Sequence, residues 1–386
     1  MHIAGGVYKE TCELPAWNAE YGSGGRAAAA VCAVSSETVL HTYAPRNAGP
    51  GISHLREMGI DIRARESAGA IAFAYFHPLS EPHVEPAPTQ IHQEAALRVS
   101  GETVLRFSFL EGDALVEAGR AIYDPQMSGV THSFDANGSR ANELALVLNE
   151  FELRSMAAME DLSEAADRLL LEQRAVTIVV KRGPRGALVF DSKAGPSHVP
   201  AFRSSRVFKI GTGDVFSAMF AHYWGEVGYS AVDATVLASR AVASYCESRL
   251  LPIPSGAGFN LEPVGLSQVG AIALHGRVDT LGRRYVIEEA RFGLTQLGAT
   301  VICPALDSPS KGTPFSESRA VLVLVDSIND DLLHNIRAAQ TPGVPLVVLT
   351  EEALDPQARV VSNAAVVATD DFTTSLYWAV WAAMSS

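Results

Sequence analysis

The sequence predicts a layered α/β protein, and three of its features support this prediction. Runs of β-branched and other apolar residues, such as 176–181, alternate with helical stretches along most of the chain. Hydrophobic residues make up 47% and charged residues 19%, which allows a large core and excludes wholesale disorder. The length of 386 residues suggests two or three domains of about 100–200 residues each.

The net charge and the cysteine content of the chain exclude some classes of partner and cellular location. Lys and Arg number 30 against 43 for Asp and Glu, which gives a net charge of −13 and argues against nucleic acid or an anionic membrane as the main partner. The four scattered cysteines form no C-x-x-C pair, as in reduced cytosolic proteins. No signal peptide opens the sequence, and no apolar run reaches the ~18–20 residues of a membrane-spanning helix. We therefore expect a cytoplasmic protein.

The clearest local structure is a pair of strands joined by a glycine-rich turn. Residues 176–181 and 187–190 are the predicted strands, and Gly-Pro-Arg-Gly lies between them. The composition of residues 162–172 favours a helix before this pair. Residues 214–225 and 231–248 are predicted to form two Ala-rich apolar helices after it.

A change of composition at residues 251–265 indicates a linker, because three prolines and three glycines occur there. We therefore divide the chain into a domain of residues 1–258 and a domain of residues 259–386. The second domain repeats the α/β pattern and is long enough for a small doubly wound sheet. Its predicted strands are 271–274, 300–303, 320–325 and 345–349, and its predicted helices are 283–297, 331–339 and 373–384.

The most informative segment spans residues 209–220, where two glycines flank a small residue directly before an apolar helix. Gly211, Thr212 and Gly213 would let backbone N–H groups converge at a helix N-terminus, where an anion is favoured. Asp214 would stand beside them, able to take a proton from an attacking hydroxyl. The same residues also fit an ordinary glycine turn in which Asp caps the helix.

The sequence from Gly211 to Phe216 resembles the G-A-G-D-x-F signature of the PfkB carbohydrate kinase family, the ribokinase-like sugar and nucleoside kinases. The resemblance extends over about residues 1–258, because five further segments appear in the family's order, among them Tyr123-Asp124-Pro125, which resembles its mid-sheet D-P segment. It implies a ribokinase-like three-layer domain with a β lid. It also implies that Gly211, Thr212 and Gly213 form an anion hole for the transferred phosphate and that Asp214 is the catalytic base.

The resemblance assigns three residues to the acceptor. Glu10 stands where the family usually holds a substrate hydroxyl with Asp, and Gly24 and Gly25 match its Gly-Gly substrate motif. The sequence departs from the family at Ala29, which replaces an Asn, and at Phe208, which replaces an Asp. Because Glu10 keeps a carboxylate, these departures indicate a changed substrate pocket beside intact transfer residues.

The resemblance assigns five residues to the donor and its metal ion. Asn149 and Glu152 match an N-x-x-E motif that helps organise Mg2+ and phosphate through water. Lys181, Gly183 and Gly186 match the turn of the nucleotide site, so the implied cofactors are ATP and Mg2+. Taken singly, these motifs also fit a polar helix start and a plain hairpin.

Two predicted strands, residues 70–76 and 104–109, would supply the β lid that the resemblance implies. The loop between them contains His77, His83 and His92. No other ligand is tightly spaced with these histidines, which favours solvated loop residues over a metal site. Lids of this family commonly pair between protomers, so the resemblance implies a homodimer through the lid.

The second domain resembles the nucleoside 2-deoxyribosyltransferase family at residues 271–276, 298–304 and 343–348. This resemblance implies a ligand-binding acid at Asp326, which also fits an N-capping cluster at a helix start. The nucleophilic Glu expected on the next helix is missing from residues 331–339. Without it, glycosyl transfer in the manner of that family is doubtful.

The favoured function is ATP-dependent phosphorylation of a hydroxymethyl group on a small-molecule sugar or nucleoside. We favour a nucleoside acceptor because the second domain resembles nucleoside-handling enzymes. Two alternatives stay open. One is a catalytically degenerate nucleotide- or nucleoside-binding sensor, and the other is a bifunctional nucleoside enzyme with glycosyl transfer or hydrolysis in the C-terminal domain.

Overall fold

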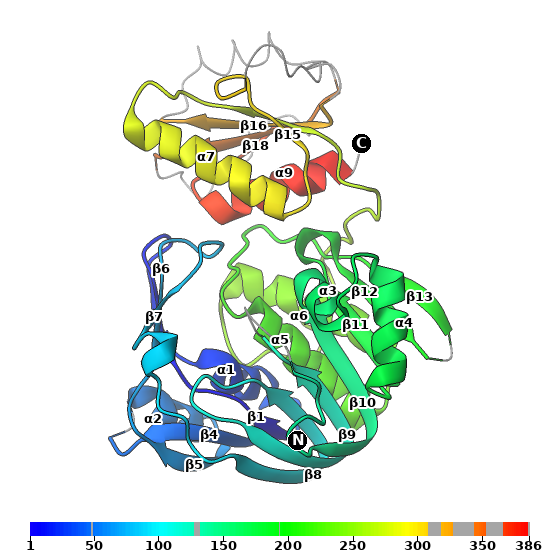
Figure 1. Ribbon diagram of the computed structural model, residues 1–386. Helices are drawn as coiled ribbons and strands as arrows, with labels where there is room; N and C mark the ends of the chain where they lie inside the picture. The colour runs from blue at the N-terminus through cyan, green and yellow to red at the C-terminus, as the bar shows by residue number, and fades with distance from the viewer. Residues whose placement is uncertain are drawn as a thin grey trace. The chain divides into compact units, whose positions relative to one another are not determined.

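The chain forms two compact α/β units in a computed structural model (Figure 1). The larger unit comprises Met1–Ser204 and Phe208–Pro263, and the smaller unit comprises Ser205–Val207 and Val264–Ser386. The predicted α/β fold with a second, smaller α/β part is confirmed. The structure describes residues 1–47, 49–126, 132–192, 194–307, 318–326, 343–352 and 366–384.

A nine-stranded sheet lies at the centre of the larger unit as far as its residues are described. Its strands are β1 (His2–Ala4), β4 (Val39–Pro45), β5 (Asp61–Ser67), β8 (Leu97–Phe107), β9 (Ala114–Asp124), β10 (Arg140–Asn149), β11 (Thr177–Lys181), β12 (Ala187–Asp191) and β13 (Ala194–Val199). They follow the order β13-β12-β11-β10-β9-β8-β1-β4-β5. The strands from β11 to β5 are parallel. Beyond β11, β12 pairs antiparallel with β11, and β13 pairs antiparallel with β12. The carboxyl ends of the parallel strands therefore share one edge, where the site residues lie.

Helices cover both faces of this sheet, because its parallel strands are apolar on both sides. One core contains residues of α1 (Gly22–Val31), α2 (Pro50–Glu57), α5 (Thr212–Phe220) and α6 (Ala231–Ser248). The other contains residues of α3 (Glu150–Ala157) and α4 (Leu162–Glu172) (Figure 1). The predicted helices 162–172 and 231–248 are confirmed. The predicted helix 214–225 is divided between α5 and a following π-helical segment, Ala221–Val227.

A separate four-stranded sheet carries part of the site. Its strands are β2 (Lys9–Cys12), β3 (Trp17–Glu20), β6 (Ala72–Tyr75) and β7 (His83–Glu85), in the order β3-β2-β6-β7. The strand predicted at 70–76 is confirmed by β6. The strand predicted at 104–109 is also present, but its expected place beside β6 is wrong. Most of that segment belongs to β8 of the central sheet, where Val104, Leu105 and Phe107 are fully buried. Such a continuous buried run is typical of a parallel strand covered on both faces.

Most of the predicted linker packs on the larger unit. Ile253 is buried, and its N–H donates to the Ala30 carbonyl at 3.0 Å. The Arg240 guanidinium donates to the carbonyls of Gly258 and Phe259, each at 2.9 Å. These contacts fix the chain as far as Phe259, and a β-bridge between Phe202 and Pro263 fixes the end of the larger unit.

The smaller unit contains a five-stranded parallel sheet in the order β15-β14-β16-β17-β18 among its described residues. Four of these strands confirm predictions, and β18 was missed. The predicted helix 331–339 lies outside the described residues. The elements are β14 (Ile272–His275), α7 (Leu281–Gln296), β15 (Val301–Ile302), β16 (Ala320–Val325), β17 (Leu346–Thr350), β18 (Val366–Thr369) and α9 (Phe372–Met384). In the described parts of both units, every helix is too short or too polar to span a bilayer.

Two histidines on neighbouring strands predict a pH dependence of stability. The rings of His2 and His41 stack, and burial, followed by the positive charge nearby, lowers the pKa of His41 from 6.5 to about 4. Below pH 6.5 the unfolded chain therefore binds a proton that folded His41 does not. We expect the free energy of unfolding to fall as the pH drops from 6.5 to about 4.

Urea unfolding of the wild type and of His41→Asn across this pH range measures the effect. The substitution should flatten the slope, whereas His198→Asn, at an exposed position of β13, should leave it unchanged. Equal slopes for the wild type and His41→Asn would disprove the assignment.

Candidate active site

The glycine loop ends in a left-handed residue at the start of α5. Gly211 is the N-cap with φ of 76°, and Thr212 and Gly213 begin the helix. Asp214 is the third helical residue and is 7% exposed. Its carboxylate caps no backbone amide, so the alternative in which Asp214 is merely the helix cap does not describe this site. The predicted loop residues therefore do lie together at a helix N-terminus.

The carboxylate of Asp214 is bound by Arg26, a residue of α1 with no exposed surface. The Nη1 atom of Arg26 donates to Asp214 Oδ2 at 2.9 Å and to Glu10 Oε1 at 3.1 Å, and Nη2 donates to Glu10 Oε2. Glu10, on β2, is 5% exposed. Burial raises the pKa of Glu10, although Arg26 pulls it downwards. The predicted acceptor residue and the predicted base thus meet at one guanidinium group.

Gly24 packs the first turn of α1 against the backbone that follows β1. A Cβ on Gly24 would lie 2.3 Å from the Gly5 carbonyl oxygen, and the Gly24 N–H donates to Gly6 O at 3.0 Å. Gly25 has more room, since its Cβ would meet side chains at 3.2 Å or beyond. The Gly-Gly motif therefore lets α1 approach closely enough for Arg26 to reach Asp214.

A second buried charge cluster lies at the carboxyl ends of β9 and β11. Lys181 Nζ donates to Asp124 Oδ2 at 2.6 Å, and Ser217 Oγ on α5 donates to the same oxygen at 2.5 Å. Burial opposes the charge on Lys181, but Asp124 and Glu152 outweigh it and raise its pKa. Asp124 Oδ1 is buried and has no hydrogen-bond partner among the described residues. Beyond β9, Gln126 Nε2 donates to Asp214 Oδ1 at 2.5 Å.

Asn149 and Glu152 form a capping box at the start of α3. Asn149 Oδ1 accepts from the Glu152 N–H at 2.8 Å, and Glu152 Oε2 accepts from the Asn149 N–H at 2.7 Å. Burial raises the pKa of Glu152 to about 7, with Lys181 opposing the rise and Asp124 adding to it. Asn149 is therefore used as a cap, and Glu152 is a buried carboxyl beside the Lys181–Asp124 pair.

Gly183 and Gly186 lie in the tight turn between β11 and β12, both with positive φ. The flanking Arg182 and Arg185 donate to the two oxygens of Glu150 at 2.6 and 2.7 Å. The turn is thereby fixed to the start of α3. This places the predicted nucleotide turn and the N-x-x-E motif side by side.

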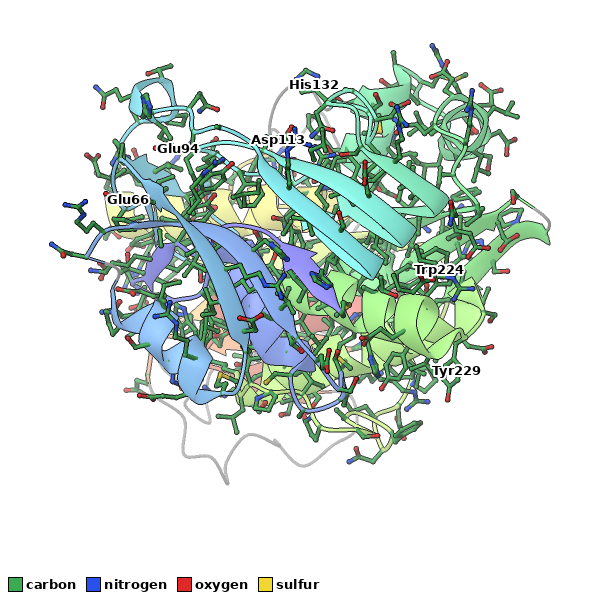
Figure 2. All side chains as sticks on the ribbon, turned by 90° about the horizontal axis from the view of Figure 1, so that it is seen from below. Glu66, Glu94, Asp113, His132, Trp224 and Tyr229 are labelled. Carbon is green, nitrogen blue, oxygen red and sulfur yellow. The ribbon has the colours of Figure 1, made fainter. Side chains whose placement is uncertain are left out.

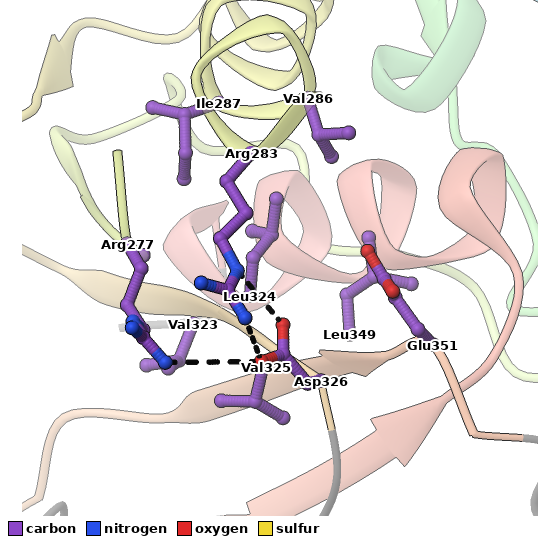
Figure 3. Close-up of a pocket in the computed structure, with 11 residues that line it drawn as sticks. Arg277, Arg283, Val286, Ile287, Val323, Leu324, Val325, Asp326, Leu349 and Glu351 are labelled. Atoms are coloured by element: carbon purple, nitrogen blue, oxygen red, sulfur yellow. Dashed lines mark hydrogen bonds and ion pairs between the residues drawn. The ribbon is translucent and has the colours of Figure 1, made fainter. Parts of the chain in front are cut away.

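The predicted acid of the smaller unit, Asp326, lines a cavity of about 350 Å3 at the carboxyl ends of β14, β16 and β17 (Figure 3). Arg283 donates to both Asp326 oxygens and to both Asp279 oxygens. Arg277 points toward Asp326 from the loop after β14, with 4.0 Å between the charged atoms. Val323, Leu324, Val325 and Leu349 are among the apolar residues that line the cavity.

A further cavity of about 440 Å3 in the larger unit contains no predicted site residue. Glu94, Asp113 and His132 lie around it (Figure 2). The buried Arg106 lines this cavity. It donates to Asp113 Oδ1 at 2.7 Å and to the Phe134 carbonyl at 2.8 Å. In the described ranges, no group of three or more His, Cys, Asp or Glu could hold a metal ion.

The sequence motifs assign no site role to Arg26, Asp124 or Gln126, although Asp124 lies in the Tyr123–Pro125 segment that resembles the family. Arg26 had a visible signal, because it is the one charged residue in the run Gly22–Val31, which is otherwise apolar or small. Asp124 and Gln126 meet their partners only through the fold, since 88 residues separate Gln126 from Asp214.

Comparisons with known proteins agree with the motifs in this part of the chain. Residues 139–250 match the family model described as pfkB family carbohydrate kinase. The deoxyribokinases of Salmonella typhi and Salmonella typhimurium are each 38% identical to this chain over 86 residues. That match covers 21% of this chain, and the chain spans 28% of the length of these relatives.

Several solved structures are similar in arrangement. A pyrophosphate-dependent kinase in the ribokinase family, complexed with a pyrophosphate analog and myo-inositol, is 14% identical, with a TM-score of 0.45 and coverage of 66% of this chain and 96% of that chain. The ribokinase of Thermotoga maritima is 16% identical, with a TM-score of 0.44 and coverage of 68% and 95%. The phosphofructokinase-2 of Escherichia coli is 13% identical, with a TM-score of 0.44 and coverage of 67% and 94%.

The family match includes both the N-x-x-E motif and the glycine loop, because residues 139–250 extend from β10 to α6. The central sheet, with helices on both faces and a small separate sheet, has the layered α/β architecture that the sequence predicts. The similarity to the pfkB family carbohydrate kinase model therefore lies in residues 139–250, which contain the glycine loop and Asp214.

Proposed function

We propose that this chain transfers the terminal phosphoryl group of ATP to a hydroxymethyl group of a sugar or nucleoside. The observation that carries the proposal is the buried carboxylate of Asp214, three residues after the left-handed Gly211 at the start of α5. A helix start supplies unpaired N–H groups and a positive dipole end, which favour a phosphoryl group. The family match over residues 139–250 supports the same reaction class.

In this proposal Asp214 takes the proton of the acceptor hydroxyl as its oxygen attacks the terminal phosphorus of ATP. The P–O bond to ADP breaks as the new bond forms, and ADP leaves with the electron pair. The amides of Gly211, Thr212 and Gly213 would bind the charge on the transferring group. Glu10, Gly24 and Gly25 would border the acceptor.

The donor would bind beside the turn at Gly183 and Gly186, with Lys181 at the end of β11 as the nearest cation of that strand. Mg2+ would be held through water at Glu152, whose buried carboxyl lies beside the Lys181–Asp124 pair. Asn149 would act indirectly, because its side-chain oxygen already caps α3. When bound, the ion would neutralise phosphate charge.

We favour a nucleoside acceptor, and a deoxyribose unit is the first to test because the curated relatives are deoxyribokinases. We further propose that the four-stranded sheet β3-β2-β6-β7 is a lid through which two copies pair. Light scattering of the purified chain would report the mass of the assembly.

ADP release from ATP and Mg2+, measured against a panel of sugars, ribonucleosides and deoxynucleosides, tests the proposal. At least one acceptor should raise ADP release above the acceptor-free rate. If no acceptor raises ADP release while ATP still binds, the result favours the second candidate, a nucleotide- or nucleoside-binding sensor. That candidate is favoured by Arg26, which already engages one oxygen of Asp214.

The cavity at Asp326 is our proposed ligand site of the smaller unit, with a nucleoside as the ligand to test. The Asp326→Asn substitution weakens the ion pair with Arg283 that forms one wall, so we expect roughly tenfold weaker binding by calorimetry. The exposed Asp167→Asn on α4 is the matched control. Both Asp326 oxygens accept from Arg283, so we also expect no release of base from deoxynucleosides. Base release that Asp326→Asn abolishes would support the bifunctional alternative.

A further inference from the structure

We propose that Arg26 is a positioning residue for the transfer, because its guanidinium group holds the carboxylates of Asp214 and Glu10 ionised and in place. The inference rests on the proposed function, since Asp214 serves as a base only in that reaction. The family resemblance gives Arg26 no role, although the residue directly follows the Gly-Gly motif.

The geometry of Arg26 connects three elements that are far apart in the sequence. The residue stands on α1, Glu10 stands on β2 of the small sheet, and Asp214 stands on α5. The fork of the guanidinium takes both oxygens of Glu10, while Nη1 also reaches Asp214. A planar fork with several donors suits such a bridge better than the single ammonium of lysine.

The charges make this bridge necessary. One oxygen of Asp214 and one of Glu10 both lie within hydrogen-bond distance of the same Arg26 nitrogen. Two buried carboxylates that share one hydrogen-bond donor lie close enough to disfavour each other's ionised form. One of them retains a proton unless a cation lies between them. Arg26 supplies that cation and has no solvent-exposed surface to weaken it.

The other charges around Asp214 do not replace Arg26. Lys181 bonds to Asp124, and Lys209 bonds to the hydroxyl of Thr212 at 2.9 Å. Burial lowers the pKa of Lys209. The charged and titratable groups that act on or with Asp214 are Glu10, Arg26, Tyr75, Asp124, Lys181, Lys209 and Tyr245.

Arg26 also sets the position of the glycine loop. A Cβ at Gly211 would lie 2.1 Å from both Cδ and Nε of Arg26. The backbone of the loop therefore packs directly against the arginine side chain. Asp214 still has capacity for a substrate proton. A carboxylate has about four lone-pair positions that can accept a hydrogen bond. Arg26 occupies one of them on Oδ2, and Gln126 occupies one on Oδ1.

The test is the pH profile of turnover in Arg26→Met, which keeps an unbranched apolar stem and removes the charged guanidinium group. The acid limb of the profile should move up by about two pH units, so turnover at pH values below both limbs should fall by up to roughly 100-fold. In the double variant Arg26→Met with Glu10→Gln, one carboxylate is gone, so most of the shift should reverse. Arg26→Lys should keep the acid limb of the wild type.

An unchanged acid limb in Arg26→Met would overturn the proposal. Higher turnover in that variant would also overturn it, because it would show that Arg26 blocks the acceptor. Carboxyl-carbon NMR provides a second test that needs neither activity nor a folded Arg26→Met variant. The wild-type resonance that is missing in Asp214→Asn should report an ionised carboxylate at pH 6 and 7, and a protonated one would refute the role. If the wild type phosphorylates no acceptor, the proposed function fails while this NMR result still decides the role of Arg26.

Discussion

Turnover of the Asp214→Asn variant should fall by roughly 10²–10⁴-fold, the usual contribution of a positioned acid or base. Asn keeps the shape of the side chain, and its one oxygen can still accept from Arg26. Its NH2 group would then face Gln126, whose amide can turn to present its oxygen. Asn cannot take a proton at neutral pH. Steady-state ADP release with the acceptor found in the panel measures the loss. Affinity for ATP should change little, because the proposed donor residues lie on β11 and the turn after it.

The free energy of unfolding distinguishes a loss of the catalytic base from misfolding of the variant. In Asp214→Asn, Arg26 still pairs with Glu10 one to one, so urea unfolding should show no loss of stability. The matched control is Asp233→Asn, because Asp233 is also the third residue of a helix, α6, but is exposed. Its turnover should equal that of the wild type. Wild-type turnover in Asp214→Asn would remove the base from the mechanism and favour the sensor.

The parallel strands of both units were predictable, because parallel strands covered on both faces are continuous apolar runs. Residues 176–181 and 320–325 are such runs, and both form strands. The segment 104–109 was assigned to the wrong sheet because the same apolar pattern fits any buried strand. Only the register with its neighbours places it in β8, and register is a property of the assembled sheet.

The site was only partly predictable. The glycine loop is local, so its geometry follows from adjacent residues. The partner of Asp214 is not local, since 188 residues separate it from Arg26. A charged residue in the run Gly22–Val31 indicates that something must compensate it once that helix is buried. The sequence shows this need but not which carboxylates meet it.

The Gly211→Ala variant should lose both stability and activity, because the left-handed conformation of Gly211 and its contact with Arg26 leave no room for a Cβ. A left-handed Ala costs about 1–2 kcal/mol, and the overlap with the buried arginine adds to this. Displacing the loop would also move the amides of the proposed anion hole, whose loss typically costs about 10²–10³ in turnover. Urea unfolding and ADP release measure the two effects.

Gly213→Ala is the matched variant two residues further on, and it separates folding from function. A Cβ at Gly213 would meet nothing nearer than Lys181 Nζ at 3.8 Å, so the protein should be as stable as the wild type. If the loop receives a phosphoryl group at close range, this added methyl group should still lower turnover, by roughly 10²-fold. Full activity of Gly213→Ala would mean that no phosphoryl group approaches this backbone. A stable and fully active Gly211→Ala would mean that the arginine contact does not set the loop. Gly213→Ala therefore tests the anion hole, and Gly211→Ala tests whether the contact with Arg26 positions the loop.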